Sequence, residues 1–137
     1  MLKKTIKYTD YNGVEREEQF FFNLTKAELM EMEMGTEGGM AGMIQKIVEV
    51  EDRPQIIKIF KDIILKAYGE KSLDGKRFAK VNDAGVPLSI GFSQTEAFST
   101  LFMELATDAD AAANFIKGII PGDINISEEE LKKLQNK

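Results

Sequence analysis

Three consecutive phenylalanines, Phe20 to Phe22, stand at the end of a stretch in which apolar and polar residues alternate. Alternate side chains of a β-strand point to opposite faces of a sheet, so Phe20 and Phe22 share one face and Phe21 lies on the other. Both faces of this strand end must therefore be covered. Either helices flank it on both sides, or Phe21 faces a partner chain, where aromatic rings are common anchors. We expect Phe20 and Phe22 to face a helix predicted over residues 54–68.

The alternation predicts a β-hairpin over residues 2–22. A two-residue turn at Asn12-Gly13 would place the apolar face of one strand opposite the polar face of the other. A three-residue loop, in which Asp10 opens a type I turn and Gly13 is a left-handed bulge, aligns the two apolar faces. We expect this second register, which pairs Ile6 with Glu18, Lys7 with Glu17 and Tyr8 with Arg16.

A helix start follows the hairpin directly. Thr25 and Glu28 have the spacing of a capping box, and Leu24 and Leu29 have that of the hydrophobic staple around it. Further along the chain, apolar residues recur with the period of amphipathic helices. Helices are predicted over about 26–34, 37–51, 54–68, 94–106 and 109–119.

The helix over 54–68 has the most continuous apolar stripe and is the expected core helix. The stripe consists of Ile56, Ile57, Phe60, Ile63, Ile64, Ala67 and Tyr68. Residues 69–91 are rich in glycine, which favours an irregular loop or a small hairpin. Ser93 and Glu96 suggest a second capping box, and Asp108 or Thr107 caps the last core helix.

These elements predict an α+β fold in which an N-terminal β-hairpin precedes a bundle of about five helices. Residues 1–121 are expected to form a single globular domain, followed by a linker and a short C-terminal amphipathic helix over 122–137. Ser127 and Glu130 mark the start of that helix. It is too short to be stable alone in water, so we expect it to fray or to dock on a partner.

Composition excludes several functional classes. The 137 residues include no cysteine and no histidine, which removes disulfides, thiol nucleophiles, common zinc sites and imidazole bases. A net charge of −5 gives no electrostatic basis for binding nucleic acid. No stretch has the length and apolarity of a transmembrane helix or a signal peptide, so no membrane partner and a cytosolic location are expected.

The acidic clusters are the main candidates for chemistry. Glu15, Glu17 and Glu18 form one cluster, and Glu28, Glu31 and Glu33 form another. Such carboxylates can bind a divalent ion, and a small metal-dependent enzyme is one hypothesis. We interpret them instead as solvated strand and helix faces. We therefore expect no catalytic residue, no metal and no cofactor.

Methionine is the most suggestive residue type. Met30, Met32, Met34, Met40 and Met43 fall within fourteen positions. The flexible thioether of methionine suits surfaces that adapt to irregular apolar partners, although methionines also fill gaps in helical cores. The predicted partner-binding residues are these five methionines together with Phe21, Leu131 and Leu134.

The order of segments resembles one known family. The segments are YTDYNGVEREEQFFFNLTKAELMEME, EGGM, IIKIFKDIILKAYGEKSLDGKRF and FSQTEAFSTLFMELATDADAAANFIKGIIP, within residues 1–121. They resemble the tail assembly chaperones of long-tailed, non-contractile (siphovirus-type) bacteriophages of Gram-positive bacteria. The likeness fades in VNDAGVPLSIG and after Pro121.

The resemblance implies a role without catalysis. Such chaperones bind the tape measure protein, keep it soluble in the host cytoplasm and promote polymerisation of the major tail tube protein around it. They are normally absent from the mature virion, and the family often makes a longer product by ribosomal frameshifting. Self-association is also expected. The alternative is a structural tail completion or connector protein of the virion.

Overall fold

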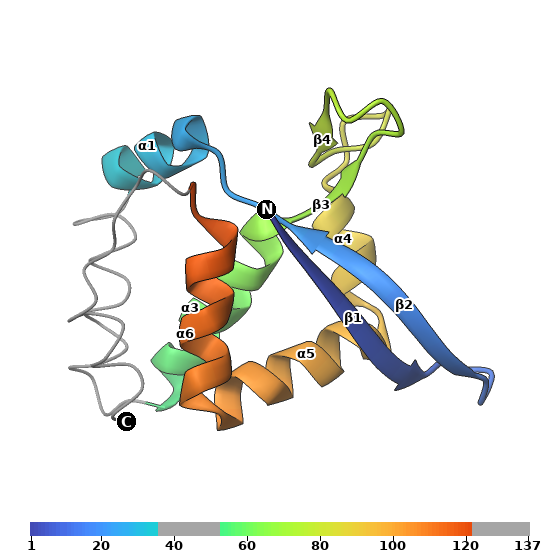
Figure 1. Cartoon of the computed structure of the whole chain (residues 1–137). Coiled ribbons are helices and arrows are strands. Elements are labelled where there is room, and N and C mark those ends of the chain that lie inside the picture. The colour runs from blue at the N-terminus through green and yellow to red at the C-terminus, as the bar shows by residue number, and fades with distance from the viewer. Residues whose placement is uncertain (36–52, 122–137) are drawn as a thin grey trace.

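The structure is a computed structural model that describes residues 1–35 and 53–121 (Figure 1). It has the mixed α+β fold that the sequence predicted. The helices predicted over 37–51 and within 122–137 lie outside the described residues. The described elements are β1 (Leu2–Thr9), β2 (Glu15–Phe22), α1 (Lys26–Gly35), α3 (Arg53–Ala67), β3 (Tyr68–Lys71), β4 (Phe78–Ala79), α4 (Leu88–Ser93), α5 (Glu96–Thr107) and α6 (Ala109–Ile119).

The hairpin of β1 and β2 has the predicted register, in which the apolar faces of the two strands are aligned. Ile6 lies opposite Glu18, Lys7 opposite Glu17 and Tyr8 opposite Arg16. The backbone N–H of Gly13 donates to the carbonyl of Asp10 at 3.0 Å, and Gly13 has a φ of +79°. Glycine adopts this left-handed conformation without steric cost, which explains the residue at this turn. The predicted three-residue loop is confirmed.

The sheet continues beyond the hairpin, in the order β1-β2-β3-β4. β3 begins at Tyr68, directly after α3 ends at Ala67, so the prediction that Tyr68 belongs to the helix is wrong. Gly69 explains the change, because a Cβ there would lie 2.5 Å from Cε2 of Phe78 and 2.7 Å from the carbonyl oxygen of Ala79. Close approach of β4 therefore requires glycine, and strand pairing overrides the helical period. The small hairpin considered for residues 69–91 forms as β3 and β4.

The core lies between the hairpin and the helices. Among the described residues, every buried core side chain is apolar, and no polar or charged residue is buried. The core cluster consists of Ile6, Phe22, Leu24, Leu29, Phe60, Ile63, Ile64, Ala67, Phe92, Ala97, Leu101, Leu105, Ala112, Phe115, Ile116, Ile119 and Ile120. Ile57, which the sequence placed on the buried stripe of α3, is 48% exposed.

The aromatic side chains of β2 face α4 and α6. The ring of Phe22 lies 5.8 Å from that of Phe92 and 5.3 Å from that of Phe115, and the ring of Phe20 lies 5.3 Å from that of Phe92. Phe22 also contacts the ring of Tyr68, the last residue of the predicted range 54–68, at 5.9 Å. The ring contacts of Phe20 are instead with Tyr8 and Phe92. The short helix α4 was not predicted from the sequence, yet it supplies Phe92, which four other rings contact.

The capping box at the start of α1 is confirmed. The N–H of Glu28 donates to Oγ1 of Thr25 at 3.1 Å, and the N–H of Thr25 donates to Oε1 of Glu28 at 3.0 Å. Leu24 and Leu29, the predicted staple residues, are both buried. The first turn of α1 is thus fixed by its own sequence.

The cap of α5 differs from the prediction. Ser93 is the last residue of α4, and Thr95 caps α5 by accepting a hydrogen bond from the N–H of Phe98 at 3.2 Å. The unpredicted α4 thus occupies the position at which the second capping box was expected. Asp108 caps α6, accepting from the N–H groups of Asp110 and Ala111 at 3.0 and 3.1 Å.

Candidate partner-binding site

The described residues include only part of the predicted partner-binding set. Phe21 lies on β2 and is half-buried, and Met30 lies on α1 with 67% of its surface exposed. Met32 and Met34 belong to α1, and their side chains lie outside the described part of the chain. The remaining predicted residues, Met40, Met43, Leu131 and Leu134, fall outside the described residues altogether.

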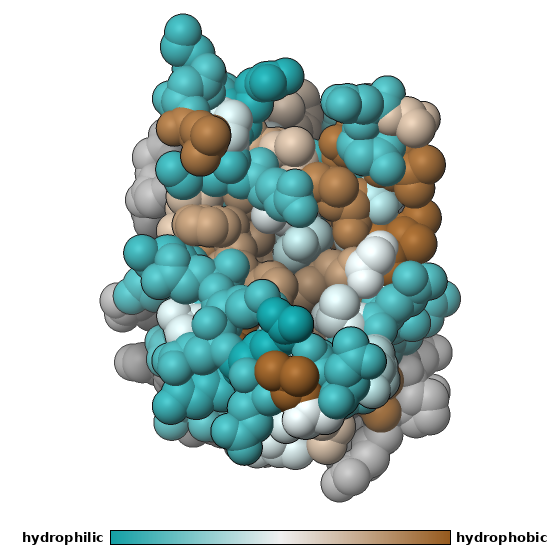
Figure 2. Space-filling view, turned by 90° about the vertical axis from the view of Figure 1, so that its right-hand side faces the viewer, coloured by the Kyte–Doolittle hydropathy of each residue, from teal (hydrophilic) through white to brown (hydrophobic). Residues whose placement is uncertain are grey.

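A groove opens beside Phe21, where β2 and β3 diverge. Its volume is about 420 Å³, and its lining residues are Glu18, Gln19, Phe20, Phe21, Tyr68, Gly69, Glu70 and Lys71. Figure 2, which views the right-hand side of Figure 1, shows a hollow in the middle of this face, with brown and tan apolar surface inside it. Met30 does not line the groove. The structure therefore brings Phe21, but not Met30, into this concavity.

The short pairing of β2 with β3 produces the groove. The two strands pair at only two positions, Phe21 with Gly69 and Phe22 with Tyr68. After these pairs β3 continues toward β4. Sequence periodicity predicted that Phe21 faces away from Phe20 and Phe22, but the groove depends on β3, whose four residues show no strand pattern.

The wall of the groove rests on the aromatic cluster. The ring of Tyr68 stacks on that of Phe92 with a centroid distance of 4.1 Å and an interplanar angle of 2°. Burial, together with the nearby carboxylate of Glu70, raises the pKa of Tyr68. Phe20, on the opposite wall, also contacts Phe92. Both walls of the groove therefore pack against the buried ring of Phe92.

Lys80, which follows β4, holds the β3–β4 hairpin against the rest of the fold. Its ammonium group donates to the carbonyl oxygens of Asn23 at 2.8 Å and Lys66 at 2.5 Å. It also lies 3.0 Å from Oε2 of Glu28. Partial burial lowers the pKa of Lys80, and the carboxylate of Glu28 offsets part of that shift. We call Lys80, Asn23, Lys66 and Glu28 the Lys80 clamp. No motif or periodicity in the sequence predicted these contacts.

The tip of the hairpin carries its own charge cluster. Nε of Arg16 lies 2.5 Å from Oδ2 of Asp10, and Nη1 of Arg16 lies 3.9 Å from Oε2 of Glu18. The hydroxyl of Tyr8 donates to Oε1 of Glu18. Hydrogen bonds from Arg16 and from the N–H of Val14 lower the pKa of Asp10. In the acidic cluster of Glu15, Glu17 and Glu18, Glu18 therefore has partners within the hairpin.

Comparison with known families decides the identity. The chain matches the family model of the phage tail assembly chaperone over residues 1–136. It belongs to the phage tail assembly chaperone family. No curated protein matches the chain, and no solved structure matches it. The match to this chaperone family extends beyond residue 121, where the sequence resemblance ended.

Family membership indicates the general role of the protein. A tail assembly chaperone acts with phage tail proteins, and the family indicates an assembly role rather than an enzymatic one. In the described part of this chaperone, no group of three or more acidic residues is arranged to hold a metal ion. No helix in residues 1–35 or 53–121 has the length and apolarity needed to cross a membrane.

Proposed function

We propose that this chaperone binds the tape measure protein of its phage, keeps it soluble and promotes polymerisation of the tail tube protein around it. The observation that carries the proposal is the family match over residues 1–136. The proposed setting is the host cytoplasm during assembly of a siphovirus-type phage of Gram-positive bacteria. The protein is proposed to leave before the virion is complete.

The proposed binding surface is apolar and adaptable. A long helical tape measure chain exposes apolar faces until the tube encloses it, and such faces aggregate unless they are covered. Methionine side chains can follow different apolar faces because they are unbranched and flexible. The exposure of Met30 and the groove beside Phe21 support this assignment. The proposed set also includes Met32, Met34, Met40, Met43, Leu131 and Leu134.

Co-expression with the tape measure protein tests the function. We expect that protein to be soluble when the chaperone is present and to aggregate when it is absent, because its apolar faces are then uncovered. The measurement is the soluble fraction after centrifugation, followed by isolation of the complex. A tape measure protein that stays insoluble with the chaperone would contradict the proposed function.

A quadruple variant tests the site. Met30, Met34, Met40 and Met43 changed together to serine should raise the dissociation constant of the complex at least tenfold, since each lost anchor is worth on the order of 1 kcal/mol. The matched control is Met103→Ser, because Met103 is also exposed, at 54%, and lies outside the proposed set. Unchanged affinity of the quadruple variant would refute the site while leaving the function standing.

Purified virions test the transient role. We expect mass spectrometry of intact particles to find no stoichiometric copy of this chain, because a chaperone is released before assembly ends. A stoichiometric signal would favour the alternative, a tail completion or connector protein.

A further inference from the structure

Within the described residues, the edge of β2 that faces away from β1 has no strand partner at residues 15–19. The N–H of Asp10 donates to the carbonyl of Val14 at 2.9 Å. Asp10 and Val14 are therefore the first hydrogen-bonded pair of the β1–β2 hairpin, counted from its turn. Hydrogen-bonded and non-hydrogen-bonded pairs alternate along an antiparallel ladder. Glu15, Glu17 and Gln19 therefore occupy non-hydrogen-bonded positions. Their N–H and C=O groups point away from β1.

β3 covers only the far end of this edge. It pairs with β2 at Phe21 and Phe22 and then diverges from it, which opens the groove. Among the described residues, no strand pairs with residues 15–19 on that side. This free stretch of five residues is about 17 Å long at the usual strand rise. It can accept one short extended segment.

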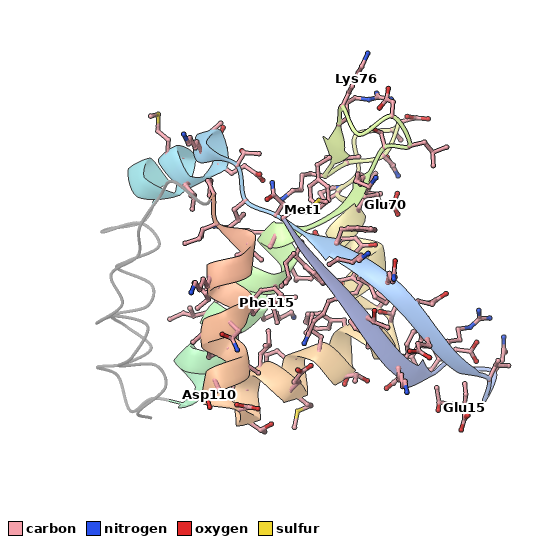
Figure 3. All side chains as sticks on the ribbon, in the orientation of Figure 1. Met1, Glu15, Glu70, Lys76, Asp110 and Phe115 are labelled. Atoms are coloured by element: carbon pink, nitrogen blue, oxygen red, sulfur yellow. The ribbon has the colours of Figure 1, made fainter. Side chains whose placement is uncertain are left out.

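The side chains along the free edge are predominantly acidic. Glu15 and Glu17 are exposed, and Figure 3 shows Glu15 near the hairpin tip and Glu70 on β3. None of these three carboxylates makes an ion pair with a described residue. Arg16 is already engaged by two carboxylates. The other cations nearby are Lys7, directly opposite Glu17 on β1, and Lys71 at the groove. Charges on an edge strand oppose pairing with strands of like charge or no charge, and they favour a strand that supplies the opposite charge.

The two faces of the edge differ in polarity. Glu15 and Glu17 lie on the face that carries Phe21, whereas Phe20 lies on the face packed against the aromatic cluster. A strand added here would alternate in the same way, because successive side chains point to opposite faces. Its residues beside the glutamates should be basic, and those toward Phe20 and Tyr68 should be apolar.

We propose that the free edge of β2 binds an extended segment of a protein partner in which basic and apolar residues alternate. The segment adds a strand to the sheet by pairing with residues 15–19, and its apolar side chains enter the groove between β2 and β3. Main-chain hydrogen bonds supply affinity in this mode, and side-chain pockets and charges supply specificity. The site shares the groove beside Phe21 with the proposed tape measure surface, but it does not involve the methionines of α1. It is tested without the tape measure protein.

Titration of the full-length, ¹⁵N-labelled chain with a synthetic peptide tests the proposal. The probe is the capped heptapeptide Lys-Val-Lys-Val-Lys-Val-Lys, and the control probe has glutamate in place of each lysine. We expect the lysine peptide to shift the amide signals of residues 15–19 and to slow their hydrogen exchange. Binding should weaken as salt rises, because charge pairing is screened. The glutamate peptide should not bind.

A matched pair of proline variants tests the role of the edge. Gln19→Pro removes an outward N–H without removing a hydrogen bond to β1. Thr5→Pro makes the same change directly opposite, on the outer edge of β1. We expect Gln19→Pro to weaken peptide binding at least tenfold and Thr5→Pro to leave it within twofold. If a proline variant does not fold, the double variant Glu15→Gln, Glu17→Gln replaces it and should weaken binding at least fivefold.

Several results would overturn the proposal. These are the absence of shifts at residues 15–19, equal binding of the glutamate peptide, or equal binding by the Gln19→Pro variant. Each leaves the co-expression test of tape measure solubility unaffected, so the two proposals fail separately.

Discussion

At the scale of single residues, Lys80 connects three parts of the chain that are distant in sequence. Its ammonium group reaches the end of β2, the end of α3 and the first turn of α1. The aliphatic stem of a lysine can pack on the surface while its charged end reaches polar partners. The Lys80 clamp therefore fixes the position of the β3–β4 hairpin, and with it one wall of the groove.

Replacing Lys80 should destabilise the fold measurably. Lys80→Met keeps the aliphatic stem but leaves the carbonyls of Asn23 and Lys66 and the carboxylate of Glu28 without this donor. We expect the free energy of unfolding to fall by about 1–3 kcal/mol. Urea denaturation followed by circular dichroism measures it. The control is Lys76→Met at the exposed β3–β4 turn (Figure 3), which should stay within about 0.5 kcal/mol of wild type.

The hairpin tip should show a pH dependence. The Arg16 guanidinium and the Val14 N–H lower the pKa of Asp10 in the folded state. A depressed carboxyl pKa contributes stability above the unfolded value of about 3.9, and this contribution is lost as the pH falls through the folded value. Carbon-detected NMR titration should find that Arg16→Gln raises the pKa of Asp10. An equal pKa in the variant would show that Arg16 has no such effect.

At the scale of elements, the junction of β3 with β4 depends on one glycine. Gly69→Ala would place a Cβ 2.7 Å from the carbonyl oxygen of Ala79, which is backbone and cannot rotate away. We expect a loss of roughly 1–3 kcal/mol in unfolding free energy. Gly91→Ala in α4 is the control, because a Cβ there meets nothing within 4 Å. It should be neutral or stabilise by up to about 1 kcal/mol. Equal stability of both variants would mean that β4 moves freely.

The sequence predicted the elements whose signals are local. Matching of faces determined the hairpin register, because a slip by one residue would turn Ile6 away from the core. The capping box of Thr25 and Glu28 determined the start of α1. Both features need only residues within one hairpin or one helical turn, and both are confirmed.

The elements that the sequence did not predict depend on tertiary contacts. Tyr68 fits the helical stripe of α3, and only its stacking on Phe92 and its pairing with Phe22 place it in β3. The six-residue α4 exposes Ile90 and buries Phe92, so it shows no clear period. For the candidate site, the alternation assigned Phe21 to the face opposite Phe20, but neither the groove nor the Lys80 clamp has a local signal.

At the scale of the whole molecule, the start and the end of the described chain meet in the core. The N–H of Leu24 donates to the carbonyl of Ile119 at 2.8 Å, and both side chains are buried. A Cβ on Gly118 of α6 would lie 3.0 Å from Cδ1 of Leu2. Helix α6 therefore closes the core against the segments around the hairpin.

Truncation should show where the core ends. We expect a chain of residues 1–121 to unfold in one cooperative transition, with a midpoint within a few degrees of the full chain. A chain of residues 1–117 loses the buried Ile119 and Ile120 and should be destabilised by more than about 4 kcal/mol. Thermal unfolding measured by circular dichroism compares them. Loss of the transition in the longer fragment would show that residues 122–137 belong to the core.

The flat stacking of Tyr68 on Phe92 gives the groove an optical signature. The chain contains no tryptophan, so its near-ultraviolet circular dichroism comes from tyrosine and phenylalanine rings. Rings held in fixed packing dominate such spectra. Because Tyr68 both lines the groove and stacks on the core, a ligand entering beside it would change ellipticity that unlabelled protein already displays. Occupancy can thus be followed in the native chain, without any attached dye.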